Sequence, residues 1–495
     1  MRGAMRVRES FLPMQHRQRP RAYEIALITG LVAVQILLVG WYLYRSGHIL
    51  QFETTLTVIS LSQGEKRAKL NPYGPGFERE LMQQFARFRD ARLKWREAHS
   101  WEEAQRLLSS GRAQILLAPG TPPRTWKGGE IVAGPSYMRA PSVLVHHRQR
   151  FGLRSIYDLC RIPVHIPNIP AFETFLTDSE FDIPCQPDII KRQDPGLQGL
   201  LQFMQTEQAR FAVVDKHRFQ AWGPFYPQVR QTYAFPKTAD TAFRCYWHRE
   251  AAAVGEALTT FWNRSQQKRQ LRRLRELYSG FFPAEMDYYE LAHLSKTVQE
   301  KLQRYLPAIR RAAEVNGLDP LWLVAMIYQE SHFKAQAESY TGVRGLMQLT
   351  QSTARELGIE NRRDPEQSIL GGARYVKYVW QRLEGHGLSA WDRWFLALAA
   401  YNQGLSHAEN AMRLTEKLGK DPQFWGDIKS VFPLLSYTRY HTQFGAGDAR
   451  GFEAVDYVQS IRWYYYVLHG FVALSRPEAE YLAPLLGLVP HGWPG

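Results

Sequence analysis

The hydrophobic periodicity of the chain changes once, near Leu291, and no other sequence feature constrains the fold as strongly. Before this point, short runs of β-branched and apolar residues alternate with amphipathic helical patterns. Alternating strands and helices predict an α/β domain with mostly parallel sheets, whereas the consecutive helical patterns that follow predict an all-α domain. We therefore expect an α/β domain over residues 54–284, an all-α domain over residues 291–475 and a C-terminal tail over residues 476–495.

The elements of both parts can be assigned from their patterns. In the α/β part, an amphipathic helix is predicted over residues 76–88 and another near Phe172. The predicted strands cover residues 55–61, 113–119, 141–147, 162–168 and 209–215. In the all-α part, Asp319 followed by Pro320 predicts the start of an apolar helix that ends near Phe333. Further helices are predicted over residues 365–383, 391–402, 406–418 and 453–468.

The N-terminal region contains a run of twenty residues, Ile25 to Tyr44, without a formal charge. As a helix rising about 1.5 Å per residue, this run is about 30 Å long, which matches a bilayer core. Six arginines and only two glutamates precede it, so the positive-inside rule places residues 1–24 in the cytoplasm. We predict a transmembrane anchor over residues 25–44, with everything after Arg45 exported. A cleaved signal peptide is the alternative, although the run is long for one and no small-x-small cleavage site follows it.

The charge and the cysteines exclude some function classes. The net charge of +15 is spread along the chain, without an RNP-like, zinc-finger or basic-helix pattern, so we expect no nucleic-acid partner. A basic surface suits anionic polymers of the cell envelope instead. The cysteines Cys160, Cys185 and Cys245 have no zinc-ligand spacing. A Cys160–Cys185 disulfide in an oxidising compartment and buried free thiols remain as alternatives.

Several segments of the α/β part resemble the type 3 periplasmic solute-binding domains, which bind amino acids between two lobes. The matching segments are residues 76–86, 113–124, 134–145, 155–166 and 209–215. The resemblance implies that Arg124 grips a ligand carboxylate, as guanidinium geometry favours, and that Asp215 grips the ligand amine. The proline- and glycine-rich run over residues 119–130 departs from the family pattern, so a muropeptide in place of an amino acid, or a cleft without any ligand, remains as an alternative.

The helical part contains three short motifs in a specific order. Glu330-Ser331 begins an E-S-x-F motif, a G-L-M-Q motif follows at residues 345–348, and an A-A-Y-N-x-G motif spans residues 399–404. Together they resemble the family 1 lytic transglycosylases, whose catalytic domain has a goose-type lysozyme-like fold. With the solute-binding-like part in front, the chain resembles the family of membrane-bound lytic murein transglycosylase F.

Glu330 is the predicted catalytic acid and base. A carboxylic acid donates a proton at neutral pH only if burial raises its pKa, and Glu330 ends an apolar helix whose negative dipole end disfavours an ionised carboxylate. A two-carboxylate hydrolase needs a second acid, and the motif segments offer only Glu338. The resemblance implies a reaction without water, in which Glu330 protonates the MurNAc–GlcNAc β-1,4 bond and then accepts the proton of the 6-hydroxyl. The product is a 1,6-anhydromuramoyl end.

The other motif residues are expected to contact the substrate. The resemblance implies this role for Ser331, Gly345, Met347, Gln348, Tyr401 and Asn402, with bare glycine backbone letting a sugar approach closely. Packing in the core is the alternative for Met347, and polar contacts at a helix end are the alternative for Asn402. A late E-T-R-x-Y-V motif of the family is kept in part as Glu453 to Val458, and Tyr457 is its tyrosine. We expect no cofactor and no metal, because no H-E-x-x-H pattern and no second ligand accompany His332.

Two alternatives to the lytic reaction remain at this point. A hydrolytic muramidase would cut the same bond with water, and a non-enzymatic envelope sensor would only bind glycan. The expected partners are peptidoglycan strands, the membrane through residues 25–44, and an amino acid or muropeptide ligand that regulates the enzyme. A retained anchor predicts the inner membrane with the catalytic part in the periplasm. Relatives with a cleaved signal sit at the outer membrane, which is the expectation if the segment is removed.

Overall fold

The computed structural model of the chain describes residues 34–35, 54–61, 70–120, 130–150, 152–177, 183, 185–192, 196–441 and 450–487. The chain divides into residues 1–54 and one compact unit, Thr55–Gly495, which holds both predicted domains. Of the predicted membrane anchor, the structure describes only Val34 and Gln35, so that prediction lies outside the described residues. Within the described ranges, no helix has the length and apolar character that crossing a bilayer requires.

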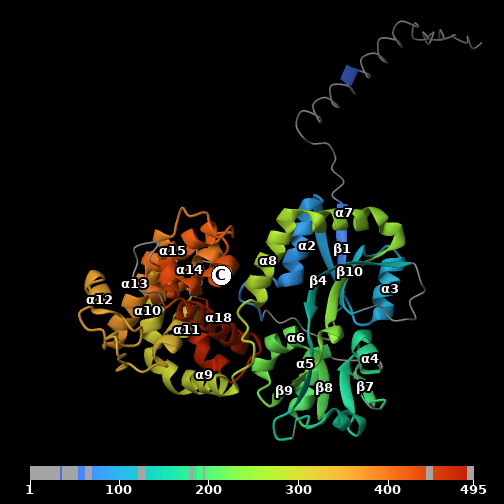
Figure 1. Cartoon of the computed structure of the whole chain (residues 1–495), viewed down its shortest axis with the longest axis horizontal. Helices are drawn as coiled ribbons and strands as arrows, with labels where there is room; N and C mark the ends of the chain where they lie inside the picture. The colour runs from blue at the N-terminus through green and yellow to red at the C-terminus, as the bar shows by residue number, and fades with distance from the viewer. Residues whose placement is uncertain are drawn as a thin grey trace, which may run out of the picture. The chain divides into compact units, whose positions relative to one another are not determined.

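The first lobe of the α/β part is a five-stranded sheet covered by helices (Figure 1). Its strand order is β2 (Ala91–Ala98), β1 (Thr54–Leu61), β3 (Ile115–Pro119), β10 (Thr241–His248) and β4 (Ile131–Ala140). The helices α2 (Phe77–Phe88), α3 (Trp101–Ser109) and α7 (Ala252–Asn263) contact these strands. The helix predicted over residues 76–88 is therefore confirmed, and its apolar stripe is buried at Leu81, Met82, Phe85 and Ala86.

The second lobe is another five-stranded sheet. Its order is β7 (Ile189–Arg192), β6 (Val164–Pro167), β8 (Phe211–Asp215), β5 (Ser142–His147) and β9 (Val229–Ala234). It is contacted by α4 (Pro170–Thr177) and α5 (Gly196–Gln205), and α6 (Lys216–Trp222) follows β8 directly. A disulfide joins Cys160 to Cys185 in this lobe, whereas Cys245 is a buried free thiol of the first lobe.

Both sheets are mixed, which corrects the expectation of mostly parallel sheets. The pairs β1–β3, β6–β7 and β6–β8 are parallel, but β10 runs antiparallel to β3 and β4, and β5 runs antiparallel to β8 and β9. The antiparallel strands are those at which the chain passes between the sheets, from β4 to β5 and from β9 to β10. Periodicity reveals that a strand exists but not its direction, so the pattern alone did not indicate these crossings.

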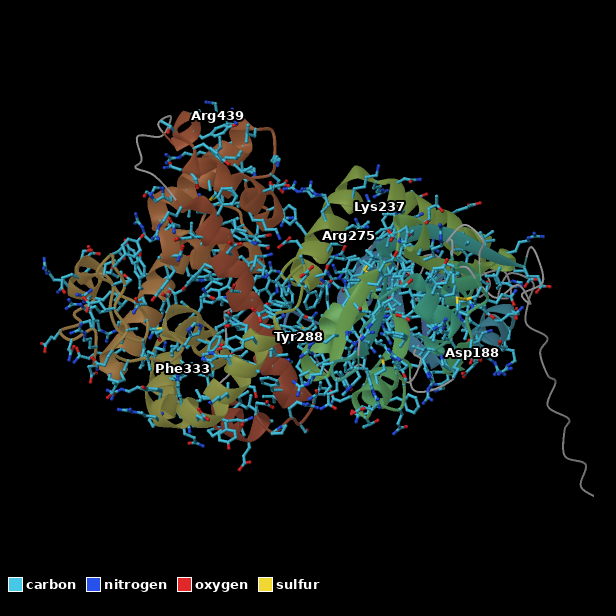
Figure 2. The ribbon with its side chains drawn as sticks, turned by 60° about the horizontal axis from the view of Figure 1, so that its bottom comes forward. Asp188, Lys237, Arg275, Tyr288, Phe333 and Arg439 are labelled. Atoms are coloured by element: carbon cyan, nitrogen blue, oxygen red, sulfur yellow. A yellow bond between two sulfur atoms is a disulfide. The ribbon has the colours of Figure 1, made fainter. Side chains whose placement is uncertain are left out.

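A long basic helix, α8 (Ser265–Ser279), ends the α/β part. Arg275 of this helix, labelled in Figure 2, donates a hydrogen bond of 2.7 Å to the backbone carbonyl of Tyr137 in β4. Arg273 pairs with Asp392 of the helical part at 2.8 Å, and Arg272 pairs with Asp427. The helix thus contacts both parts of the compact unit.

The rest of the chain is all-helical, as predicted (Figure 1). The helices are α9 (Tyr288–Lys301), α10 (Leu306–Asn316), α11 (Pro320–Ser331), α12 (Gln351–Glu356), α13 (Pro365–Arg382), α14 (Ala390–Gln403), α15 (Leu405–Lys417), α16 (Trp425–Val431), α17 (Thr438–His441), α18 (Gly451–Ala473) and α19 (Ala479–Leu482). The first begins at Tyr288 (Figure 2), three residues before the predicted start of this domain at Leu291. The last, α19, lies in the segment that was expected to be a tail.

The central helix of this part, α11, forms for the reasons the sequence indicated. The side chain of Asp319 caps its N-terminus by accepting a hydrogen bond of 2.8 Å from the backbone of Leu321, and Pro320 occupies the first helical position. Every residue from Pro320 to Tyr328 is buried, which is the mark of a helix inside a core rather than on a surface. It packs against α10, α13 and α18. Contacts with three helices therefore hold α11 inside the helical part.

Candidate active site

Glu330 is the second-last residue of α11, and its side chain is partly exposed. The hydroxyl of Tyr457 donates a hydrogen bond of 2.5 Å to its Oε1 atom. Burial of the carboxyl raises the pKa of Glu330 to about 8, and the hydrogen bond from Tyr457 acts in the opposite direction. The group is therefore protonated at neutral pH and still reachable from solvent, which a proton donor requires.

Two tyrosines from different helices meet beside this carboxyl. Tyr457 lies on α18 and Tyr401 on α14, and their rings are stacked with centroids 6.4 Å apart. Burial is the largest cause that raises the pKa of both hydroxyls well above 10, so both act as neutral hydrogen-bond donors. The hydroxyl of Tyr401 donates to the backbone carbonyl of Met347 at 2.8 Å. The structure thus brings Glu330, Tyr401 and Tyr457 together from three distant sequence positions.

The G-L-M-Q segment is joined to the end of α11 by Ser331. Its hydroxyl is buried and lies 3.0 Å from the carbonyl of Leu346 and 3.1 Å from that of Ile327. The side chain of Met347 is fully buried, so it packs in the core, and its carbonyl is the part that holds Tyr401. Of the two roles expected for this side chain, cleft lining and core packing, the structure shows core packing.

Gln348 is partly buried and has a left-handed backbone with φ of 45°. Its side-chain amide donates to the carbonyl of Gly345 at 2.8 Å and to that of Ala337 at 3.3 Å. His332 and Phe333, two and three residues after Glu330, have φ of 48° and 60°. Such conformations cost about 1–3 kcal/mol each in non-glycine residues and gather at functional sites. Their presence at two of the three motifs supports a functional reading of this region.

The two glycines of this loop differ in what they leave room for. A side chain on Gly345 would meet the backbone carbonyl of Arg362 at 1.8 Å, and the residue has φ of 84°. Packing therefore requires this glycine. Gly342, with φ of 80°, has open space where its side chain would lie. Of the two, only Gly342 leaves an opening into which another molecule could approach the backbone.

Asn402 follows Tyr401 and is partly exposed at the end of α14. Its side-chain oxygen accepts a hydrogen bond of 2.7 Å from Gln403, whose own side-chain oxygen accepts one of 3.0 Å from the backbone of Arg450. Arg450 also pairs with Glu453, and both side chains are about half exposed. Asn402 is therefore positioned by a chain of contacts that reaches the start of α18.

A second carboxylate is not coupled to Glu330 within the described part of the chain. Burial and the hydroxyl of Tyr457 are the influences on its pKa, and no other acid contributes. Glu338, the second acid noted in the sequence, pairs with Arg344 and Arg363. Hydrogen bonding from Arg344 is the largest cause that lowers the pKa of Glu338, so this side chain is ionised. It is not set up as a proton donor.

Two residues that position the site were missed by sequence reasoning. Arg362 is buried and donates to the carbonyls of Gly342 and Leu349 at 2.9 Å and 2.8 Å, which ties both ends of the loop together. The buried hydroxyl of Ser368 accepts a hydrogen bond of 3.2 Å from the backbone of Met347. Neither lies in a recognisable motif, so no sequence signal pointed to them.

Of the two predicted ligand contacts of the α/β part, the structure describes Asp215 only. Arg124 lies outside the described residues. Asp215 ends β8 and is fully buried; its carboxylate accepts hydrogen bonds from the backbone and the Nε atom of Arg218 at 2.8 Å and 2.5 Å. A cavity of about 510 Å³ lies close by, lined among others by Glu78, Arg218 and Trp222.

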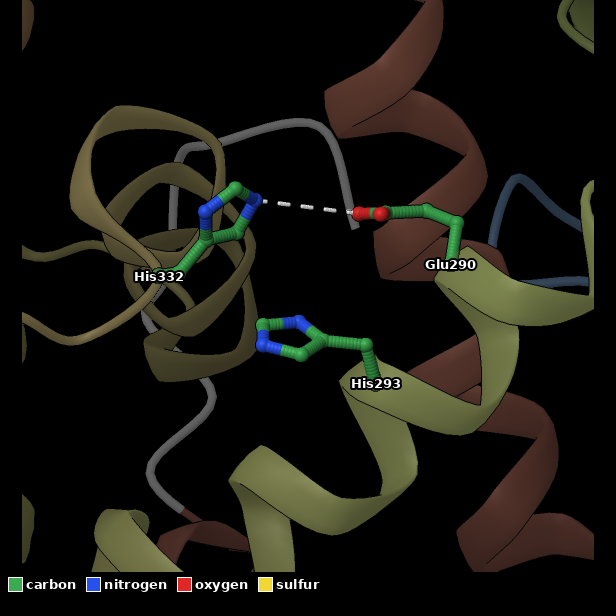
Figure 3. Close-up of side chains that lie close together, drawn as sticks. All are labelled: Glu290, His293 and His332. Carbon is green, nitrogen blue, oxygen red and sulfur yellow. Dashed lines mark ion pairs between the residues drawn. The ribbon is translucent and has the colours of Figure 1, made fainter.

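His332 has partners that the sequence did not reveal. Glu290 and His293 of α9 lie beside it, and one potential ligand atom of each of the three residues lies within 4.8 Å of the others (Figure 3). His332 itself ends α11 in a left-handed conformation. Along the sequence no second metal-ligand residue accompanies His332, but in space Glu290 and His293 lie beside it.

Known proteins match this chain both within its helical part and across most of its length. The family model described as "Transglycosylase SLT domain" matches residues 307–424. Membrane-bound lytic murein transglycosylase F of Marinobacter nauticus is 33% identical over 82% of this chain and 79% of its own length. Membrane-bound lytic murein transglycosylase F 1 of Alkalilimnicola ehrlichii is 31% identical over 92% of this chain and 94% of its own.

Solved structures similar to this chain include periplasmic binding proteins. A crystal structure of ArgBP from T. maritima matches with 14% identity over 46% of this chain and 95% of that one, at a TM-score of 0.37. The BvgS VFT2 domain of Bordetella pertussis matches with 13% identity over 48% of this chain and 97% of that one, at a TM-score of 0.38.

The relatives match across both parts of the compact unit, and the family model covers the helices that carry Glu330 and Tyr401. The chain belongs to the family of membrane-bound lytic murein transglycosylase F.

Proposed function

We propose that this protein cleaves the MurNAc–GlcNAc β-1,4 bond of peptidoglycan without water, with Glu330 as the one catalytic acid and base. The observation that carries the proposal is geometric. The carboxyl lies in the last turn of a helix that is buried from Pro320 to Tyr328, is held by the hydroxyl of Tyr457 at 2.5 Å, and has no second carboxylate coupled to it within the described residues. A two-carboxylate hydrolase needs a partner acid, whereas an internal displacement does not.

In the first step, Glu330 donates its proton to the glycosidic oxygen. The bond between C1 of the muramoyl residue and that oxygen breaks, and the GlcNAc side leaves with a free 4-hydroxyl. Positive charge develops on the muramoyl ring as the bond breaks. We assign Tyr401 and Asn402 to hold the sugar and its N-acetyl group during this step. We assign Gln348 to contact the substrate from the G-L-M-Q segment.

In the second step, the 6-hydroxyl of the same muramoyl residue attacks C1. Glu330, now a carboxylate, accepts the hydroxyl proton, and the new C1–O6 bond closes the 1,6-anhydro ring. The enzyme recovers its starting protonation state, and no water is consumed. Tyr457 donates its hydrogen bond to the carboxylate form, so we assign it the role of stabilising Glu330 between the two steps.

The roles of Ser331, Gly345 and Met347 are narrower. Their hydrogen bonds and packing join the loop to α11 and α14, so we assign them to positioning the cleft wall rather than to polar contacts with the sugar.

Mass analysis of murein digested by the full-length chain in detergent tests this mechanism. The expected products are one water lighter than hydrolytic fragments, and the Glu330→Gln variant yields none. Fully hydrated products would make the protein a muramidase instead. Binding of glycan without any product would support the envelope sensor.

We also propose that a ligand in the α/β part regulates cleavage, with an amino acid or a muropeptide as the candidate. The cavity of about 510 Å³ beside α6 supports this, and Tyr466 of α18 is among its lining residues. We keep Arg124 and Asp215 as ligand contacts, although Asp215 becomes available only if Arg218 moves away from it.

The helix α18 is the proposed link between the two parts. It carries Tyr457, which contacts Glu330, and Arg462, which is fully buried and pairs with Glu276 of α8 at 2.7 Å. One helix thus contacts both the catalytic carboxyl and the α/β part. If the lobes have two arrangements and a ligand binds one of them more tightly, the ligand would shift this helix toward its position in that arrangement.

Cleavage rates with and without candidate ligands test the regulation. We expect at least one amino acid or muropeptide to change the rate, and the change to disappear in Arg462→Met. An equal rate with every candidate would contradict the regulation without affecting the assignment of the cleavage reaction.

The relatives are named as membrane-bound, and we propose the same for this chain. The uncharged run over residues 25–44 supports a retained anchor in the inner membrane, with the compact unit in the periplasm. Release of the protein by salt or carbonate washing would contradict the anchor, and a shortened N-terminus would indicate cleavage and favour the outer membrane.

A further inference from the structure

Three side chains of the kinds that bind metal ions in proteins lie together where α9 passes the end of α11. Glu290 and His293 are one turn apart on α9, and His332 follows α11 (Figure 3). All three side chains are partly exposed, so an ion from solvent can reach them. No sequence pattern pointed to this group, because His332 stands 39 residues from His293 and belongs to no metal-binding spacing.

The distances suit a metal ion after small adjustments. Nε2 of His332 lies 3.8 Å from Oε1 of Glu290, and the rings of His293 and His332 lie edge to face with centroids 5.1 Å apart. Zinc binds imidazole nitrogen and carboxylate oxygen at about 2.0–2.2 Å, which places tetrahedral ligand atoms about 3.3 Å apart. The ligand atoms lie within 4.8 Å of one another, so side-chain rotations that bring them closer by up to about 1.5 Å close the site.

Two tyrosines hold the group from behind. The hydroxyl of Tyr464 donates to Oε1 of Glu290 at 2.9 Å, and the hydroxyl of Tyr328 lies 2.7 Å from Nδ1 of His293. Tyr328 also approaches the backbone carbonyl of Glu290 at 3.4 Å. Metal-binding histidines and carboxylates in proteins are typically oriented by such outer hydrogen bonds, which are often decisive for affinity. A simple ion pair between His332 and Glu290 would need neither His293 nor Tyr328.

We propose that Glu290, His293 and His332 bind one divalent transition-metal ion of the zinc class. Two imidazoles and one carboxylate suit zinc and its neighbours, whereas calcium and magnesium prefer sites built from oxygen alone. Three protein ligands leave room for water as a further ligand. The ion joins α9 to the residue that ends α11, two positions after Glu330, and so fastens the end of the catalytic helix. It takes no part in the cleavage steps.

Titration calorimetry with zinc chloride tests the proposal on the full-length chain in detergent, without a histidine tag and after removal of metals by a chelator. We expect one zinc ion per chain with a Kd at about the micromolar level or tighter, no response to magnesium chloride, and a rise in Tm with zinc. If the calorimetry detects no zinc binding, the proposal is overturned.

Matched variants locate the ion. His293→Ala and the more conservative His293→Gln are expected to weaken zinc binding on the order of 100-fold, and Tyr464→Phe by about 10-fold. His386→Ala, which changes an exposed histidine elsewhere in the helical part, leaves it unchanged. Unchanged zinc affinity in a folded His293→Ala or His293→Gln variant would contradict this site. An equal loss of zinc affinity in His386→Ala would contradict it as well. If His293→Ala does not fold, His293→Gln and Tyr464→Phe decide the matter.

Discussion

Two acidic side chains end buried elements in the two parts of the molecule, and they are treated in opposite ways. Asp215 ends the buried strand β8, and Arg218 supplies both a backbone and a guanidinium donor to its carboxylate. Glu330 lies at the end of the buried helix α11 and receives one neutral hydroxyl, that of Tyr457, without a cation. The carboxylate of Asp215 thus has a positively charged partner inside the protein, and the carboxyl of Glu330 has only a neutral one.

The difference shows how the same residue class serves structure in one place and chemistry in another. A carboxylate with a cationic partner is stable as an ion, and breaking such a buried pair is costly. A carboxyl that is desolvated without a cation keeps its proton, which can then be transferred to a substrate. A substitution at Asp215 should therefore lower mainly the stability of the protein, and a substitution at Glu330 should lower mainly its activity.

The largest expected effect is on catalysis. Glu330→Gln is expected to lower murein cleavage by about 10³-fold, because the general acid is lost while the neutral side chain keeps its shape. The Tm should not fall, since an amide removes no ion pair here. Muropeptide chromatography and a melting curve measure the two quantities. Glu338→Gln is the control and should keep a rate within about tenfold of the parent, because Glu338 is exposed and paired outside the site.

Asp215→Asn is expected to have the reverse profile. The asparagine can still cap α6, but Arg218 loses its charged partner, and breaking a buried ion pair costs about 3 kcal/mol of unfolding free energy. Chemical denaturation measures this loss, and the rate per folded molecule, measured without any added amino acid or muropeptide ligand, should be unchanged. The exposed pair of Arg311 with Glu366 offers a control, since Glu366→Gln should change stability by less than about 1 kcal/mol. A loss of activity without a loss of stability would end the contrast between the two acids.

Tyr457→Phe sharpens the contrast at the catalytic acid itself. Removing the hydroxyl deprives the ionised form of Glu330 of its hydrogen bond, which is expected to slow cleavage by about 10-fold to 100-fold. Tyr466→Phe, on the same helix, is the matched control because its hydroxyl contacts the carbonyl of Ala221 instead. Equal effects of the two substitutions would mean that Tyr457 acts only through packing.

The pH dependence gives the smallest but most specific difference. The pKa of Glu330 is raised to about 8, so cleavage should decline as pH rises through that value, when measured with a chelator present. The folded state holds this proton more tightly than the unfolded one, so stability from this group falls between about pH 4.5, the ordinary value, and pH 8. Glu330→Gln should abolish that slope, and Tyr457→Phe should move the decline to higher pH. A decline unchanged in Tyr457→Phe would assign it to another group.

Much of the local structure was predictable because its causes are local. The N-cap at Asp319, the proline after it and the apolar run to Tyr328 lie within ten residues and specify α11 without reference to the rest of the chain. The helix α2 follows from its apolar stripe in the same way. Strand directions were predicted less well, since the mixed pairing of β5 and β10 depends on where the chain crosses between the sheets.

The two-part organisation, most helices and strands, and the candidate acid Glu330 follow from the sequence, because periodicity, capping and short motifs act over a few residues. Which groups surround that acid depends on the tertiary structure. Tyr457 reaches Glu330 across 127 residues, Met347 turns into the core, and Glu290 and His293 meet His332. These contacts depend on how whole helices pack against one another, and side-chain neighbours set by packing leave no pattern along the chain.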